Sequence, residues 1–117
     1  MLVDGVWIFE VSGAYGWERL STVFLEKGRY VGGGASIYSR GTYKIKGKNI
    51  KIKLKVIQHG KTLAIFGKKL KSFSSVMKAK RHGDMFEGEI SLKGAHSTVV
   101  KPKFRLIRLA DIPNFPK

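Results

Sequence analysis

The chain has 117 residues, which is room for one domain and one hydrophobic core. Hydrophobic residues make up 43% and charged residues 26%, so a globally disordered chain is excluded, and the absence of cysteine excludes disulfides, thiolate metal sites and a cysteine nucleophile. Lys and Arg number 23 against 8 Asp and Glu, a formal net charge of +15 that indicates an anionic partner.

Short segments rich in β-forming residues follow one another along the chain, with turn residues between them. Their apolar residues recur with a period of two, and no window shows the spacing of an amphipathic helix. The pattern predicts about eight strands, within residues 6–11, 19–26, 29–31, 37–38, 42–46, 49–56, 72–80, 85–92 and 98–109.

The clearest strand covers residues 49–56, where Ile, Ile, Leu and Val alternate with three lysines. Such alternation is typical of a half-buried antiparallel strand. Gly47 and Lys48 precede it and form a plausible two-residue hairpin loop after residues 42–46. This loop would pair Lys46 with Asn49, Lys44 with Lys51, and Thr42 with Lys53.

The successive hairpin signals predict an all-β fold, a single antiparallel up-and-down barrel of eight strands. Closure would remove the exposed sheet edges that invite aggregation. We expect the barrel domain to occupy residues 1–110 and an irregular C-terminal tail to occupy 111–117, which contains Pro113 and Pro116.

Several motifs occur in the order found in a known family. They are Asp4-Gly5-Val6-Trp7, the Gly28 turn, Gly32-Gly33-Gly34, Gly41-Thr42-Tyr43 and the turn and alternating strand over 46–56. Together they resemble the GrlR family, the negative regulators of type III secretion. The resemblance is best over residues 4–56 and is architectural beyond them.

The resemblance implies a lipocalin-like eight-stranded barrel with an apolar interior, often dimeric, and no catalysis. It implies repression of virulence transcription through binding of a DNA-binding activator, which contacts alternating acidic residues on a hairpin turn. The matching turn here is Lys46-Gly47-Lys48-Asn49, which is basic. The chain is therefore expected to share the scaffold and to bind a different partner, since a scaffold does not fix function.

Residues 27–83 contain no acid and hold 16 of the 23 Lys and Arg residues. The expected binding surface is a basic outer face that meets an acidic protein partner. Its candidate residues are Lys44, Lys46, Lys48, Lys51, Lys53 and Lys55. Solvated surface lysines are the simpler interpretation of any one of them. Nucleic acid is the alternative polyanion, and Tyr30, Tyr38, Tyr43, Phe66 and Phe73 are the aromatics of the same block.

The barrel interior is a further candidate site, for a small apolar ligand or lipid tail. The residues expected to line this cavity are Ile45, Ile52, Leu54, Phe73, Met77, Phe86, Ile90 and Phe104. Gly88 shares their parity and would leave space. The competing interpretation is a filled core.

Catalytic and metal-binding chemistry is not indicated. The spacings of His59, His82 and His96 match no metal motif, and Gly32-Gly33-Gly34 lacks the Lys-Ser/Thr of a phosphate loop and is better explained as a bend. Glu87 and Glu89 share a strand face and are expected to pair with lysines on the preceding strand. We expect no enzyme activity and no cofactor.

The N-terminus has no secretory signal pattern and no segment is apolar enough to span a membrane, so we expect a cytoplasmic protein.

Overall fold

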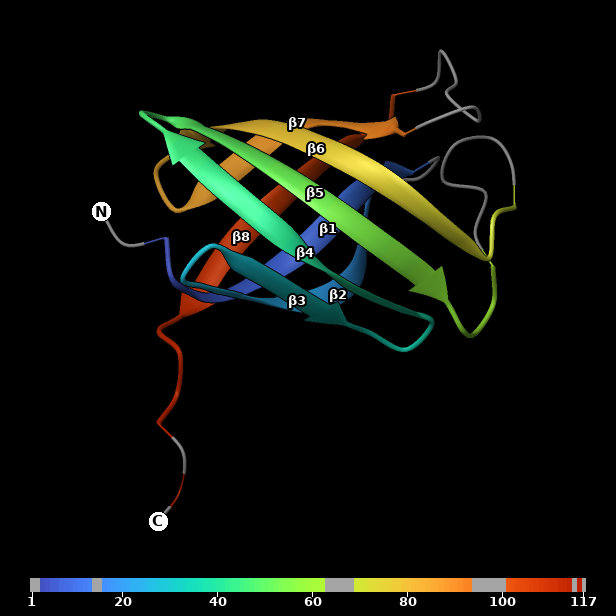
Figure 1. The fold of residues 1–117 in the computed structure, drawn as a ribbon, viewed down its shortest axis with the longest axis horizontal. Helices are drawn as coiled ribbons and strands as arrows, with labels where there is room; N and C mark the ends of the chain where they lie inside the picture. The colour runs from blue at the N-terminus through green and yellow to red at the C-terminus, as the bar shows by residue number, and fades with distance from the viewer. Residues whose placement is uncertain (1–2, 14–15, 63–68, 94–100, 115, 117) are drawn as a thin grey trace.

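The computed structural model describes residues 3–13, 16–62, 69–93, 101–114 and 116, and it contains one closed β-barrel (Figure 1). Each strand lies beside the next in sequence, and the last returns to the first. The strands are β1 (Gly5–Gly13), β2 (Gly16–Glu26), β3 (Arg29–Gly33), β4 (Ile37–Lys46), β5 (Asn49–Gln58), β6 (Ser72–His82), β7 (Met85–Leu92) and β8 (Lys103–Ala110).

All eight strand pairs are antiparallel, and β8 pairs with β1 to close the barrel. The prediction of an all-β, up-and-down, eight-stranded barrel is therefore confirmed. The topology is compatible with lipocalin-like folds.

Five strands, β1, β2, β3, β5 and β6, are longer than their predicted segments, and β4 and β8 differ in other ways. The separate segments 37–38 and 42–46 form one strand, β4, because Gly41 keeps its pairing with Tyr30 on one side and Leu54 on the other. The last strand begins at Lys103 rather than at residue 98. Residues 98–100 lie outside the described part of the chain.

The predicted β4–β5 hairpin has the expected register. Lys46 pairs with Asn49, Lys44 with Lys51 and Thr42 with Lys53. Gly47 has a φ of 60°, the left-handed conformation that a tight hairpin requires at that position and that glycine adopts without strain. This register fixes which lysines are neighbours on the outer surface.

The barrel interior is filled mainly by aromatic and branched side chains. Trp7 and Phe86 pack with ring centroids 5.3 Å apart, and Phe9 and Phe104 pack at 6.0 Å. The residues that were expected inside and are buried there are Ile52, Leu54, Phe73, Met77, Phe86, Ile90 and Phe104. The exception is Ile45, which is 41% exposed.

The expected burial of Ile45 is wrong because this residue lies one position before the end of β4. It has the parity of the buried Tyr43 and pairs with the buried Ile50, but at the hairpin end of the barrel it stays 41% exposed. Gly88 also differs from expectation. A methyl group on Gly88 would collide with the backbone carbonyl of Lys78, so the glycine permits close approach of two strands and leaves no space.

The residues before β1 are tied to distant strands. The Tyr43 hydroxyl donates a hydrogen bond to Asp4 Oδ1 at 3.0 Å, and Arg108 donates to the Asp4 backbone oxygen at 2.8 Å. Trp7 Nε1 donates to the Val3 carbonyl at 2.9 Å. After β8, residues 111–114 and 116 form neither helix nor strand. The described residues include no helix long and apolar enough to cross a membrane.

Candidate binding face

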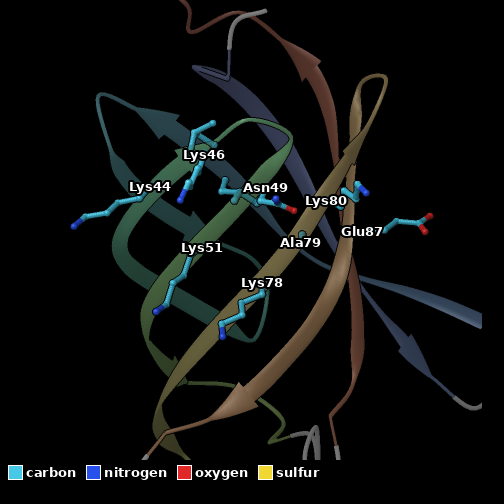
Figure 2. Close-up of a pocket in the computed structure, with 10 residues that line it drawn as sticks. Lys44, Lys46, Asn49, Lys51, Lys78, Ala79, Lys80 and Glu87 are labelled. Atoms are coloured by element: carbon cyan, nitrogen blue, oxygen red, sulfur yellow. The ribbon is translucent and has the colours of Figure 1, made fainter.

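Three lysines from neighbouring strands form a continuous row on the outside of the barrel. Lys44 of β4 pairs with Lys51 of β5, and Lys51 pairs with Lys78 of β6. All three are exposed. Figure 2 shows their side chains extending from adjacent strands. Neighbouring strands are about 4.8 Å apart, so three positive charges are concentrated within roughly 10 Å along this row.

The same strands carry further exposed cations on their outer surfaces. Arg40 pairs with Lys55, which makes a second like-charge pair across β4 and β5. We use the name basic face for the exposed cationic residues of β4, β5 and β6, which are Arg40, Lys44, Lys46, Lys51, Lys53, Lys55, Lys78 and Lys80. Lys48, the remaining candidate, is exposed but occupies the hairpin turn itself.

On β4 and β5, the cations of the basic face have no acidic cross-strand neighbour. No residue from 27 to 83 is acidic. Among the described residues, ion pairs within 4.0 Å involve Glu10 with Arg19 and Arg105, and Asp111 with Arg108, and none involves a lysine of the basic face. Like charges directly opposite each other on a sheet are destabilising. The isolated protein therefore bears an electrostatic cost on this surface.

The surface of β1, β2 and β8 provides the contrast. Glu10 accepts hydrogen bonds from Arg105 at 2.7 Å and Arg19 at 3.2 Å, and its side chain is only 8% exposed. Burial raises the pKa of Glu10, but the hydrogen bonds and charges of Arg105 and Arg19 outweigh it, so its pKa is lowered overall. Arg105 also lies over the Trp17 ring at 4.3 Å. Arg19, Arg105 and Arg108 on this side therefore have anionic partners within the protein.

Acidic residues begin at the β7 border of the basic face. Glu87 pairs with Lys80 and Glu89 pairs with Lys78 across β6 and β7, as the strand parity predicted. Figure 2 shows Glu87 beyond Lys80 at this border. The part of the positive surface without acidic cross-strand neighbours therefore lies on β4 and β5, and Lys78 at its border has Lys51 on one side and Glu89 on the other.

Two shallow depressions flank the Lys44–Lys51 pair. The larger has a volume of about 720 Å³ and reaches across β4, β5 and β6 to Glu87 (Figure 2). The smaller has a volume of about 300 Å³ and is lined by Thr42, Tyr43, Lys44, Lys51 and Lys53. The larger depression is the more open, and its lining combines lysines with the apolar side chains of Ile45, Ile50 and Ala79.

The barrel interior has little free space. The cavity between Phe9, Tyr30, Leu54, Met77 and their neighbours holds about 20 Å³. Ligand pockets are commonly about 300–1,000 Å³, so this cavity is of the size that accommodates one water molecule. The geometry favours the filled core and gives no support to carriage of an apolar ligand.

Most aromatic residues of the basic block belong to the core. Tyr30, Tyr43 and Phe73 are buried, and Phe66 lies outside the described residues. Tyr38 is 48% exposed and its ring lies 5.6 Å from that of His59. One exposed aromatic of the block is therefore available for base stacking among the residues described.

The glycine run covers the end of β3 and the start of the connection to β4. Gly32 and Gly33 belong to β3, and Gly34 follows it. A methyl group on Gly34 would collide with the Leu20 carbonyl, and the Gly34 amide donates to the Ile37 carbonyl at 2.8 Å. These contacts support a tight bend and use the amide of Gly34 within the protein.

The sequence pattern identified the lysines of β6, Lys78 and Lys80, only as expected partners of Glu87 and Glu89, and it left Arg40 unassigned. The structure places all three on the same surface as the predicted lysines. The sequence contained the information needed to place Lys78 and Lys80 on this surface. An up-and-down barrel must pair β5 with β6, and apolar and polar residues alternate in both strands. What the alternation did not supply was the register of that pair across the long connection from residue 59 to residue 71.

Two comparisons with known proteins found no relative. No protein-family model matches the chain. A search of curated proteins also gave no match. The GrlR resemblance therefore rests on the quoted motifs, of which Asp4 and Tyr43 are in direct contact.

Proposed function

We propose that this chain is a non-enzymatic binding protein whose basic face docks on an acidic surface of a protein partner. The observation that carries the proposal is the row Lys44–Lys51–Lys78, in which three exposed lysines are direct cross-strand neighbours without an acidic partner within 4.0 Å among the described residues. An acidic partner would convert this repulsion into attraction and speed association.

The GrlR resemblance adds a biological role to the proposal. It suggests regulation by masking a protein partner, with the charge of the contact reversed relative to the acidic turn of that family. By this resemblance, the matching turn belongs to the hairpin of β4 and β5, which carries lysines at 44, 46, 48 and 51.

Acidic protein is favoured over nucleic acid by the composition of the charged strands. β5 contains no aromatic residue, and the aromatic residue of β6, Phe73, is buried. Binders of single strands interleave exposed aromatics with their cations so that bases can stack. Tyr38, near the outer edge of the basic face, is a limited platform for that purpose.

The experiment is affinity capture from nuclease-treated host lysate with three baits. These are the natural protein, K44E/K51E/K78E, and the matched control K61E/K93E/K101E, which makes the same change in net charge at exposed lysines outside the basic face. The proposal predicts an acidic protein that the natural protein and the control retain and the first variant loses. Equal capture of the acidic protein by all three baits would contradict the proposal. Capture that is lost when the lysate is treated with nuclease would contradict it as well.

A further inference from the structure

An apolar row lies beside the basic face on the same outer surface. Val6 of β1 pairs with Phe24 of β2, and Phe24 pairs with Val31 of β3. Phe24 is 43% exposed and Val31 is 54% exposed, while Val6 is half-buried. Large apolar side chains in contact with water on a sheet surface are a common feature of interaction sites.

The apolar row runs directly into the basic face. Val31 pairs with Arg40 of β4, and Arg40 pairs with Lys55 of β5. One line of cross-strand neighbours therefore changes from apolar to cationic between β3 and β4. Figure 1 shows β3, β4 and β5 as adjacent strands of the barrel wall.

We infer that the partner docks through an acidic segment that also carries bulky apolar side chains, with its carboxylates on the basic face and its apolar groups on Phe24 and Val31. This inference rests on the proposed function and names the chemistry of the partner. The positive charge of the basic face is complementary to the carboxylates of the segment. The apolar row continues into the basic face and is complementary to the apolar side chains of the same segment.

The spacing suits a short extended peptide. Val31 and Lys55 are two strands apart, which is roughly 10 Å. An extended chain covers this distance in about three residues. An apolar residue and a carboxylate a few positions apart in one segment could therefore engage both halves of the surface together.

A second copy of this chain is a less suitable occupant. It would bring a formal charge of +15 against an equally charged molecule, and a two-fold contact would set the cationic half of the row against either the cationic or the apolar half of the other copy, neither of which is complementary to it. Nucleic acid would meet a valine at the centre of the row, between Phe24 and Arg40, and valine has no face on which a base can stack.

The test measures fluorescence anisotropy with two labelled probes, a peptide in which pairs of glutamates alternate with pairs of leucines, so that each face of the extended chain carries both residue types, and its counterpart with serine in place of leucine. The natural protein should bind the leucine peptide roughly tenfold more tightly. The variant F24S/V31T should lose that difference and keep its affinity for the serine peptide. The control L109T changes an exposed apolar residue on β8 and should behave as the natural protein does.

The outcomes separate the two proposals. If the serine peptide binds in a lysine-dependent way and leucine adds nothing, the inference is overturned and the proposed function stands. If neither peptide binds the natural protein, both are overturned. The inference would also be overturned if oligothymidylate bound the natural protein more tightly than the leucine peptide and F24S/V31T lost that binding. A monomer–dimer equilibrium of the natural protein in sedimentation that F24S/V31T abolished would overturn it as well.

Discussion

Lys44 and Lys51 are direct cross-strand partners on the outer surface of the β4–β5 hairpin, and both are exposed. Lys78 extends the pair to β6, so Lys51 has a lysine on each side. A folded protein gains nothing from this arrangement by itself, because opposed like charges weaken a sheet. The adjacent placement of these lysines is explained if a negatively charged partner covers the surface and neutralises them.

The first prediction concerns stability. Lys51→Glu replaces two repulsive neighbours with two attractive ones and should stabilise the free protein by about 1 kcal/mol at low salt. Urea unfolding monitored by circular dichroism measures the change. Lys53→Glu is the matched control, because its cross-strand neighbours are Thr42 and Val76 and it should gain less. Equal gains in unfolding free energy for Lys51→Glu and Lys53→Glu would show that the net charge, and not the repulsion within the Lys44–Lys51–Lys78 row, determines the change in stability.

The second prediction concerns the glycine in the middle of β4. A methyl group on Gly41 would collide with the Lys53 carbonyl, so Gly41→Ala should destabilise the barrel by about 2 kcal/mol or more. Gly33→Ala is the control, since an added methyl group there meets open space and the glycine has no positive φ. Similar unfolding midpoints for the two variants would contradict the close approach of β4 and β5.

The strands and the hairpin could be predicted because they depend on local signals. Alternation over residues 49–56 and a Gly-Lys loop fixed which face each lysine takes, and the register followed from the loop length. The predictions for Ile45 and Gly88 were wrong because strand parity indicates toward which face a side chain points but not how deeply it is buried. How deep a side chain lies depends on where the strand ends and how closely neighbouring backbones approach. Those are properties of the closed barrel and not of the segment.

The apolar row illustrates the same limit. Phe24 and Val31 belong to different strands, and their pairing with each other and with Arg40 required the registers of β2, β3 and β4. Residues 20–34 offer no clear alternation from which to derive them, because glycines interrupt the pattern. The sequence therefore pointed to the basic half of the surface and gave no sign of the apolar half.

The third prediction concerns Glu10, whose pKa is lowered overall because Arg105 and Arg19 outweigh the effect of burial. A lowered pKa in the folded state gives stability that is present above the unfolded value, near 4.5, and is lost as pH falls through the folded value. Glu10→Gln should therefore cost about 1–2 kcal/mol at neutral pH and less in acid. Urea unfolding from pH 7 to pH 3 measures this, with exposed Glu18→Gln as control. A pH-independent cost would contradict the ion-pair account.

The fourth prediction concerns Tyr30, which is 1% exposed inside the barrel. Burial raises the pKa of its phenol well above the ordinary value of 10.0, while a hydrogen bond with Ser39 opposes the shift in part. The unfolded chain therefore ionises first, and the associated stability, complete below about pH 10, declines as pH rises further. Tyr30→Phe should show a shallower alkaline decline in urea unfolding than the natural protein. Parallel curves above pH 10 would contradict the burial of this hydroxyl.

The most direct test of the central claim combines affinity and charge placement. Binding of the labelled glutamate–serine peptide is titrated against the natural protein, K44E/K51E/K78E and K61E/K93E/K101E at low and moderate salt. If the basic face is the binding surface, the first variant loses binding by at least tenfold, the second stays close to the natural protein, and affinity falls as salt rises. An equal loss in both variants would show that the total charge attracts the peptide without a defined site, and it would contradict the account.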